Sequence, residues 1–193
     1  MSATHLTIKE AADLSGVSVR SIEKAAEEGV ITKRLLQESL RSVRAAHVPV
    51  HVVAYASVLK HARGFHMDIS TKKRLFRCIL DFGDTLGTFE PVPGVRLAVD
   101  KLASAEWIRA MSYVAARRTY LESRNDILGG EPVIKGTRIT CRSVLGRVEG
   151  GDSLEDLTED YETIPRAAFE AAITYARANP PRGRPASNKP WRR

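Results

Sequence analysis

Four side chains close to the start of the sequence have the types and the spacing for contacts with nucleic acid. The beginning of a predicted second helix presents outward Ser18, Arg20, Ser21 and Lys24. In helix-turn-helix proteins this end of the second helix enters the major groove, where an Arg guanidinium can bind a guanine edge. Arg20 is therefore the best candidate for a contact with a base.

A second group of basic residues follows this motif. Interleaved with apolar residues, it comprises Lys33, Arg34, Arg41 and Arg44. The pattern predicts a wing or another segment that contacts the phosphate backbone. The alternative is a helical hairpin with a solvated charged face. Because a turn, an apolar stripe and a basic flank coincide here, we favour DNA binding over that alternative.

Two short helices around a tight turn must position these side chains. Thr7 can cap the first helix, with Glu10 completing a capping box, and Ser18 can cap the second helix. Gly16 can adopt the positive φ that the turn needs, and Gly29 can stop the second helix. The apolar stripe that the second helix would bury consists of Val19, Ile22 and Ala26.

Residues 6–34 resemble the helix-turn-helix of the MerR and excisionase class. They depart from that class at Glu23, Lys24 and Ala25, where MerR activators usually have Arg followed by two aromatic residues. The resemblance implies binding in a DNA groove, and the departure argues against MerR-type activation.

Residues 67–124 are expected to form a helical linker that also dimerises the chain, after a winged DNA-binding domain over residues 1–66. Helices are predicted from Pro49 to about His61, from Ser70 onward and over 105–123, with a loop over 81–94 and a short strand from Val95. The long last helix is expected to bury Ile108, Met111, Tyr113 and Val114.

The C-terminal part predicts a compact module over residues 125–179. A β-hairpin is expected around Gly136, followed by three short helices. The first ends at Gly150-Gly151, the second begins at Ser153 and the third begins near Pro165. All three carry apolar stripes, which predict a trihelical, homeodomain-like core. The fold class is thus mainly α with short β-hairpins: an N-terminal winged helix-turn-helix plus this trihelical module.

The same residues carry a second resemblance. The chain contains Gly-Glu-Pro-Val-Ile-Lys-Gly-Thr-Arg-Ile, then Gly151 before Ser153-x-Glu-Asp-Leu, then Tyr161 four residues before Pro165. These motifs closely resemble the domain-of-unknown-function family numbered 433. Members that join this domain to a helix-turn-helix resemble VapB-type antitoxins, whose neighbouring genes encode PIN-like ribonuclease toxins. The resemblance implies an antitoxin that binds such a toxin and its own operator DNA as a homodimer.

The formal charge of +7 is unevenly distributed. Residues 126–178 contain 6 basic and 10 acidic residues, whereas residues 179–193 contain 5 basic residues and no acidic one. Phosphate would be repelled by the module, so its Ala-rich third helix is expected to associate with protein, either a second copy or a partner. Charge that merely keeps the chain soluble is the alternative.

Two functions are open for the Pro-rich tail, residues 180–193. Arg182 and Arg184 could enter the acidic metal site of a PIN-like nuclease, with Trp191 and the preceding Arg177 as further contacts. Alternatively, Pro-Arg-Gly-Arg-Pro is the core of an AT-hook, which lies in the minor groove. On the family resemblance we favour toxin neutralisation. The alternative is a free-standing regulator with an AT-hook-like arm.

No metal site, cofactor or catalytic group is expected. His47 and His51 have a spacing that could bind metal on a helix, but Pro49 separates them and no further ligand completes the set. Cys78 and Cys141 lack zinc-ligand spacing and are expected to be reduced. The sequence shows no nucleophile beside a base, no phosphate-binding glycine loop and no clustered carboxylates, so no enzyme is predicted. No apolar run suits a membrane span, which favours a cytoplasmic protein.

Overall fold

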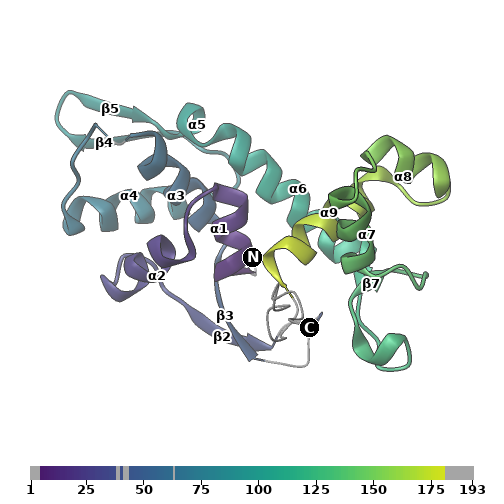
Figure 1. The fold of residues 1–193 in the computed structure, drawn as a ribbon. Coiled ribbons are helices and arrows are strands. Elements are labelled where there is room, and N and C mark those ends of the chain that lie inside the picture. The colour runs from purple at the N-terminus through teal and green to yellow at the C-terminus, as the bar shows by residue number, and fades with distance from the viewer. Residues whose placement is uncertain (1–4, 38–39, 41–43, 63, 181–193) are drawn as a thin grey trace, which may run out of the picture.

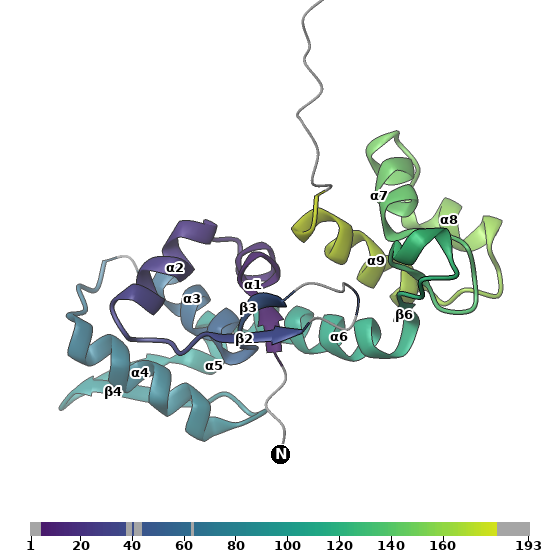
Figure 2. The same cartoon turned by 90° about the horizontal axis from the view of Figure 1, so that it is seen from below.

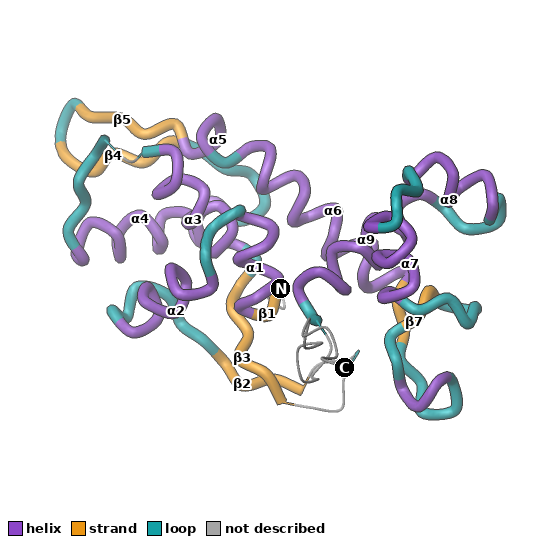
Figure 3. Tube along the Cα trace, viewed as in Figure 1, coloured by secondary structure: helices purple, strands orange, loops and turns teal. Residues whose placement is uncertain are grey.

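The computed structural model describes residues 5–37, 40, 44–62 and 64–180, and these are mainly helical with short antiparallel strands (Figure 3). Helix α6 (Ser104–Tyr120) joins an N-terminal lobe to a C-terminal lobe (Figure 1). One hydrophobic core continues through both lobes, from Leu6 to Ala176. Within the described ranges, no helix is both long and apolar enough to cross a membrane.

Two short helices form the predicted N-terminal pair, α1 (Ile8–Ser15) and α2 (Val19–Glu27). The capping box of Thr7 and Glu10 is present, Gly16 has φ 64°, and Ser18 caps α2, so these local predictions are confirmed. The predicted stripe of α2 is wrong in part. Ile22 and Ala25 are buried, whereas Val19, the first residue of the helix, is 36% exposed.

A three-stranded antiparallel sheet is formed by the segments that precede and follow this helix pair in the sequence. The strands are β1 (His5–Thr7), β2 (Arg34–Gln37) and β3 (Arg44–Pro49), in the order β1-β3-β2. The strand β3 lies in the middle and pairs with β1, which precedes α1, and with β2, which follows α2. The strand β2 is therefore an edge strand. This sheet fixes the direction in which the chain leaves α2.

The rest of the N-terminal lobe contains two helices and a hairpin. Its elements are α3 (His51–His61), α4 (Ile69–Phe82), β4 (Thr88–Val92), β5 (Val95–Ala98) and α5 (Val99–Leu102). The predicted α3 and α4 are confirmed, although Asp68 rather than Ser70 caps α4. The expectation of a loop over 81–94 is wrong at its end, because β4 pairs with β5.

The long helix α6 lies at the centre of the molecule, in contact with α1, α3 and α9. It buries Trp107, Ala110, Tyr113 and Ala116. The expected burial of Ile108 is wrong, since its side chain is 65% exposed. Trp107, one position earlier, fills the inward position instead and donates a hydrogen bond from Nε1 to the Asp84 carbonyl at 3.1 Å.

The C-terminal lobe contains the three predicted helices. Its elements are β6 (Leu121–Glu122), the 3₁₀ turn η1 (Leu128–Gly130), β7 (Val133–Ile134), α7 (Cys141–Glu149), α8 (Leu154–Asp160) and α9 (Arg166–Ala178). Gly136 has φ 76° in a local turn, as predicted. The predicted hairpin is wrong in part, because residues 138–139 form no strand and β7 pairs with β6 instead. Of the expected pairing, the Ile134 N–H donates to the Ile139 carbonyl, and Val133 forms an isolated bridge with Thr140.

Helix α9 is buried on more than one face. One side packs on α7, and another side packs on α1 and α6. Ala168, Phe169 and Ala172 are fully inaccessible to solvent. Small side chains here let α9 approach three helices of its own chain. These residues belong to the core, and association with a partner protein stays a prediction for the exposed positions Arg166, Glu170 and Arg177. In both views α1 lies between α2 and α9 (Figure 1, Figure 2).

Candidate nucleic-acid interface

The outer face of α2 carries a pair of exposed charges. Arg20 donates hydrogen bonds to both carboxylate oxygens of Glu27, at 2.6 and 3.0 Å, and its Nη1 lies 3.9 Å from Glu23. From its place at the far end of the helix, Glu27 was expected to stay clear of DNA phosphates, but its pairing with Arg20 was not foreseen. Two turns of helix bring both side chains to one face. The hydrogen bonds raise the pKa of Arg20 and lower the pKa of Glu27.

The other predicted DNA-contacting side chains of α2 differ in whether they already bind a partner within the protein. Ser18 accepts a hydrogen bond from the Ser21 backbone N–H, and the two hydroxyl oxygens are 2.8 Å apart. Both hydroxyls are therefore held at the start of the helix. Lys24 Nζ lies 3.8 Å from Glu28 and its side chain is 66% exposed, which leaves the ammonium accessible to a phosphate.

The hairpin that follows α2 carries the second predicted group. Arg34 stands opposite His47 in β2 and β3, and both Lys33 and Arg34 are exposed. Arg44 is also exposed, at the start of β3. Arg41 lies outside the described residues. The structure thus brings three of the four basic residues onto one hairpin next to α2.

The structure adds a basic element that the sequence analysis missed. Lys72 Nζ of α4 lies 3.9 Å from Glu28 Oε2, and Lys73 Nζ would lie 3.6 Å from a Cβ on Gly29. The first turns of α4 therefore stand beside the end of α2. The two adjacent lysines were visible in the sequence, but nothing local places α4 near α2, because the two helices are joined by a sheet and another helix.

A buried ion pair holds α1 in place under this surface. Arg117 Nη1 donates to both oxygens of Glu10 at 2.7 Å, and its Nη2 donates to the His5 carbonyl at 2.9 Å. The Tyr113 hydroxyl also donates to Glu10. Burial opposes the ionisation of Glu10, but Arg117 and Tyr113 outweigh it, so the pKa of Glu10 is lowered. Three elements, β1, α1 and α6, meet at this carboxylate.

The C-terminal end of α1 is held by cations from two other helices. Arg109 Nη2 of α6 donates to the Leu14 carbonyl at 2.8 Å, and Lys60 Nζ of α3 donates to the Ser15 carbonyl at 3.4 Å. These carbonyls have no partner inside the helix, so the two cations complete them and complement the helix dipole. As a result, α1 is fixed at both ends.

The predicted toxin-binding residues lie mostly beyond the described chain. Arg182, Arg184 and Trp191 are outside the described residues. Arg177 is exposed in the last turn of α9, and its charge acts on Asp13 of α1. Burial raises the pKa of Asp13 against the opposing charges of Arg177 and Arg109.

The two histidines with metal-like spacing lie on different elements. His47 of β3 contacts the Ala45 carbonyl through Nδ1 at 2.8 Å, and Nε2 of His51 in α3 lies 3.1 Å from the Gly83 carbonyl. Over the described ranges, no group of three His, Cys, Asp or Glu side chains could hold a metal ion. Cys78 and Cys141 are both free thiols.

Comparison with known proteins places the C-terminal lobe in a family. The uncharacterized protein y4eO of Sinorhizobium fredii is 41% identical over 71 residues, which are 37% of this chain and 32% of that protein, so the chain spans about a third of its length. The crystal structure of Rv2018 from Mycobacterium tuberculosis aligns over 86% of this chain and 95% of that chain, with a TM-score of 0.39 and 16% identity. Residues 122–176, which run from β6 into α9, match the family described as a protein of unknown function, DUF433, and thus form a module of that family.

Proposed function

We propose that this chain is the antitoxin of a type II toxin-antitoxin system, which inhibits a PIN-like ribonuclease toxin and represses its own operon by binding operator DNA. The observation that carries the proposal is the combination, in one chain, of a DUF433 module with a helix pair that is flanked by exposed basic side chains on the following hairpin and on α4. We infer that α1, α2 and the β2-β3 hairpin act as a winged helix-turn-helix, and that α7 to α9 form a homeodomain-like core.

The DNA-binding part of the proposal is supported by the arrangement of basic side chains. Lys24 lies on α2, Lys33, Arg34 and Arg44 lie on the hairpin, and Lys73 lies on α4 beside the end of α2. With α2 in the major groove, the flanking residues would contact phosphates on either side. Helix α9 does not obstruct α2, because α1 lies between them.

Arg20 has a specific part in this proposal. In the free protein its guanidinium is bound to Glu27, and both side chains are more than half exposed. Exposed ion pairs are weak, so a guanine edge can replace the carboxylate at little cost. Glu23 and Glu27 would at the same time repel phosphates from this face, which favours a specific groove contact over non-specific binding.

The toxin-binding part is assigned to the end of α9 and the tail. Arg177 is exposed, and the following segment contributes Arg182, Arg184 and Trp191. Arg side chains can pair with the carboxylates that hold Mg²⁺ in a PIN-like nuclease, which would block the site. The proposed complex is cytoplasmic, and the antitoxin is a homodimer on its operator.

Co-expression with the product of the neighbouring gene tests this proposal. The full chain and the nuclease should co-purify, and ribonuclease activity should return when the tail carries Arg182→Ala and Arg184→Ala. Lys189→Ala combined with Arg192→Ala, in the same tail, removes the same two charges and is the matched control. If the two proteins do not co-purify, or if the neighbouring gene encodes no small acidic nuclease, the antitoxin proposal is wrong.

The Pro-Arg-Gly-Arg-Pro sequence supports a second candidate, a free-standing regulator with an AT-hook-like arm. Deletion of residues 180–193 separates the two candidates. A large loss of affinity for A·T-rich operator DNA with toxin binding unchanged supports the regulator. Loss of toxin binding with DNA affinity nearly unchanged supports the antitoxin.

A further inference from the structure

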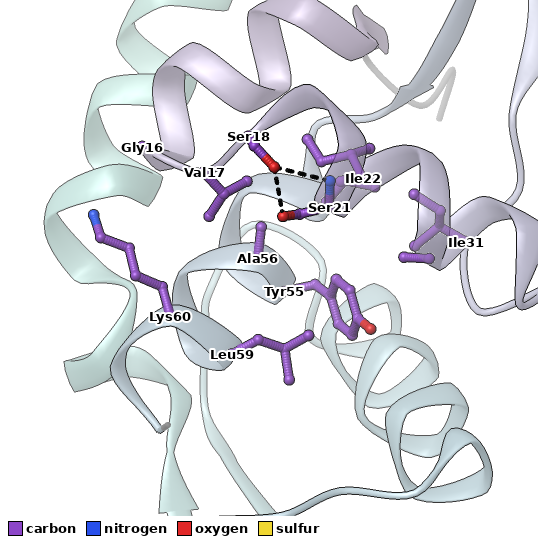
Figure 4. Close-up of a pocket in the computed structure, with 12 residues that line it drawn as sticks. Gly16, Val17, Ser18, Ser21, Ile22, Ile31, Tyr55, Ala56, Leu59 and Lys60 are labelled. Atoms are coloured by element: carbon purple, nitrogen blue, oxygen red, sulfur yellow. Dashed lines mark hydrogen bonds between the residues drawn. The ribbon is translucent and has the colours of Figure 1, made fainter. Parts of the chain in front are cut away.

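An apolar pocket lies between the turn of the helix pair, α2 and α3 (Figure 4). Its volume is about 380 Å³, within the range of about 300–1,000 Å³ that is usual for small-molecule sites. Val17, Ile22, Ala56 and Leu59 supply aliphatic walls, and the ring of Tyr55 forms an aromatic one. The pocket is thus large enough for a compact organic molecule and mostly apolar.

The polar groups of the pocket gather at its turn side. Lys60 extends along the pocket toward Gly16 (Figure 4), and the linked Ser18 and Ser21 hydroxyls line the same part. Lys60 Nζ is 3.4 Å from the Ser15 carbonyl and 3.6 Å from Glu106 Oε1. The side chain is 31% exposed, so the ammonium can still take an anionic partner.

The carboxylate of Glu106 contacts two basic side chains, Lys60 and His61. Glu106 accepts from His61 Nε2 at 3.2 Å as well as facing Lys60. Because Glu106 is shared with His61, it neutralises the charge of Lys60 only in part. The ammonium of Lys60 therefore leaves positive charge at the mouth of the pocket. Complementarity calls for a ligand with one negative charge next to an apolar body.

Tyr55 contributes its ring rather than its hydroxyl to the pocket. The ring forms the aromatic wall, and the hydroxyl points away from Lys60, Ser18 and Ser21 (Figure 4). The polar contacts to a bound molecule would therefore come from the turn side of the pocket alone.

We propose that this pocket binds a small monocarboxylate with an aromatic or short aliphatic body. The body lies against Tyr55, Ala56 and Leu59, and the carboxylate pairs with Lys60 and accepts from Ser18 or Ser21. The binding itself does not depend on the proposed DNA function. If that function holds, the ligand also acts on operator affinity, because Ser21 and Ile22 of α2 form one wall of its site.

Binding of 2-naphthoate to the full chain, measured by calorimetry, tests the proposal, with neutral 2-naphthol as the comparison. We expect naphthoate to bind at least about tenfold more tightly than naphthol, a factor that corresponds to about 1.4 kcal/mol. Lys60→Met should remove this preference while naphthol binding is retained. Lys72→Met, a lysine of similar exposure that is also ion-paired but does not line the pocket, should leave the preference unchanged.

Ala56→Phe fills the pocket and should abolish binding of both compounds. Because this change can also disturb the core, nuclear Overhauser contacts between naphthoate and the side chains of Tyr55 and Leu59 are measured in the unaltered protein. Those contacts are expected. The proposal is wrong if naphthoate does not bind, if it contacts other residues, or if naphthol binds as tightly. Operator binding is measured separately, so its failure does not affect this result.

Discussion

Arg117 binds both carboxylate oxygens of Glu10 at 2.7 Å, across more than a hundred residues of sequence. Glu10 is completely buried, and it also completes the capping box of α1. The same carboxylate thus closes the first turn of the helix pair and joins it to the central helix α6. Glu10, which marks the start of a helix in the sequence, thus also makes a buried polar contact between two distant segments.

The first prediction concerns the strength of this contact. Arg117→Ala should lower the free energy of unfolding by about 3 to 5 kcal/mol, because it leaves a buried carboxylate without its partner. Chemical denaturation measures this loss. The control is Arg124→Ala, which breaks a similarly short pair with Asp126 in which both side chains are more than half exposed, and which should change stability little. Similar losses in the two variants would mean that the Glu10 pair has no special role.

The second prediction is the pH dependence of the same contact. The pKa of Glu10 lies below its ordinary value of 4.5 in the folded protein, so its ionised form stabilises the fold above that pH. This contribution is lost as the pH falls through the folded pKa. The stability difference between the natural protein and Glu10→Gln should therefore be largest above about pH 5 and shrink in more acidic solution. A difference that grows toward low pH would contradict the lowered pKa.

The third prediction concerns the base contact. Arg20→Ala should weaken operator binding roughly tenfold to a hundredfold and relax the preference at one base pair. Glu27→Gln should strengthen binding, because it frees Arg20 and removes a negative charge from the DNA-facing side. Electrophoretic mobility assays with the operator and single-base variants measure both effects. An unchanged affinity for Arg20→Ala would remove this residue from the recognition surface.

The fourth prediction concerns α4. Lys73→Ala should weaken binding to all DNA sequences alike and reduce the slope of log affinity against log salt by about 1. Titrations at several salt concentrations show this slope. Lys101→Ala, an exposed lysine of α5, serves as the control. If both variants have the slope of the natural protein, α4 does not contact the phosphate backbone.

The sequence determined the local structure of the helix pair. Thr7, Glu10, Gly16 and Ser18 each act within one turn of chain, and all four have the predicted role. The motifs around Gly136 and Ser153 indicated the DUF433 module, which the comparison confirmed over residues 122–176. Signals of this kind depend on residues three or four positions apart, so they can be read without knowledge of the fold.

The tertiary structure decided which faces are covered and which charges meet. Trp107 is buried instead of Ile108 because α6 lies between three other helices. The spacing of apolar residues in the sequence does not specify which helices pack against α6. Alanines of α9 pack within the chain although they resemble a free association surface. Arg117 reaches Glu10 only because α1 packs against α6. Contacts between distant segments depend on the whole core, and therefore only the folded molecule revealed them.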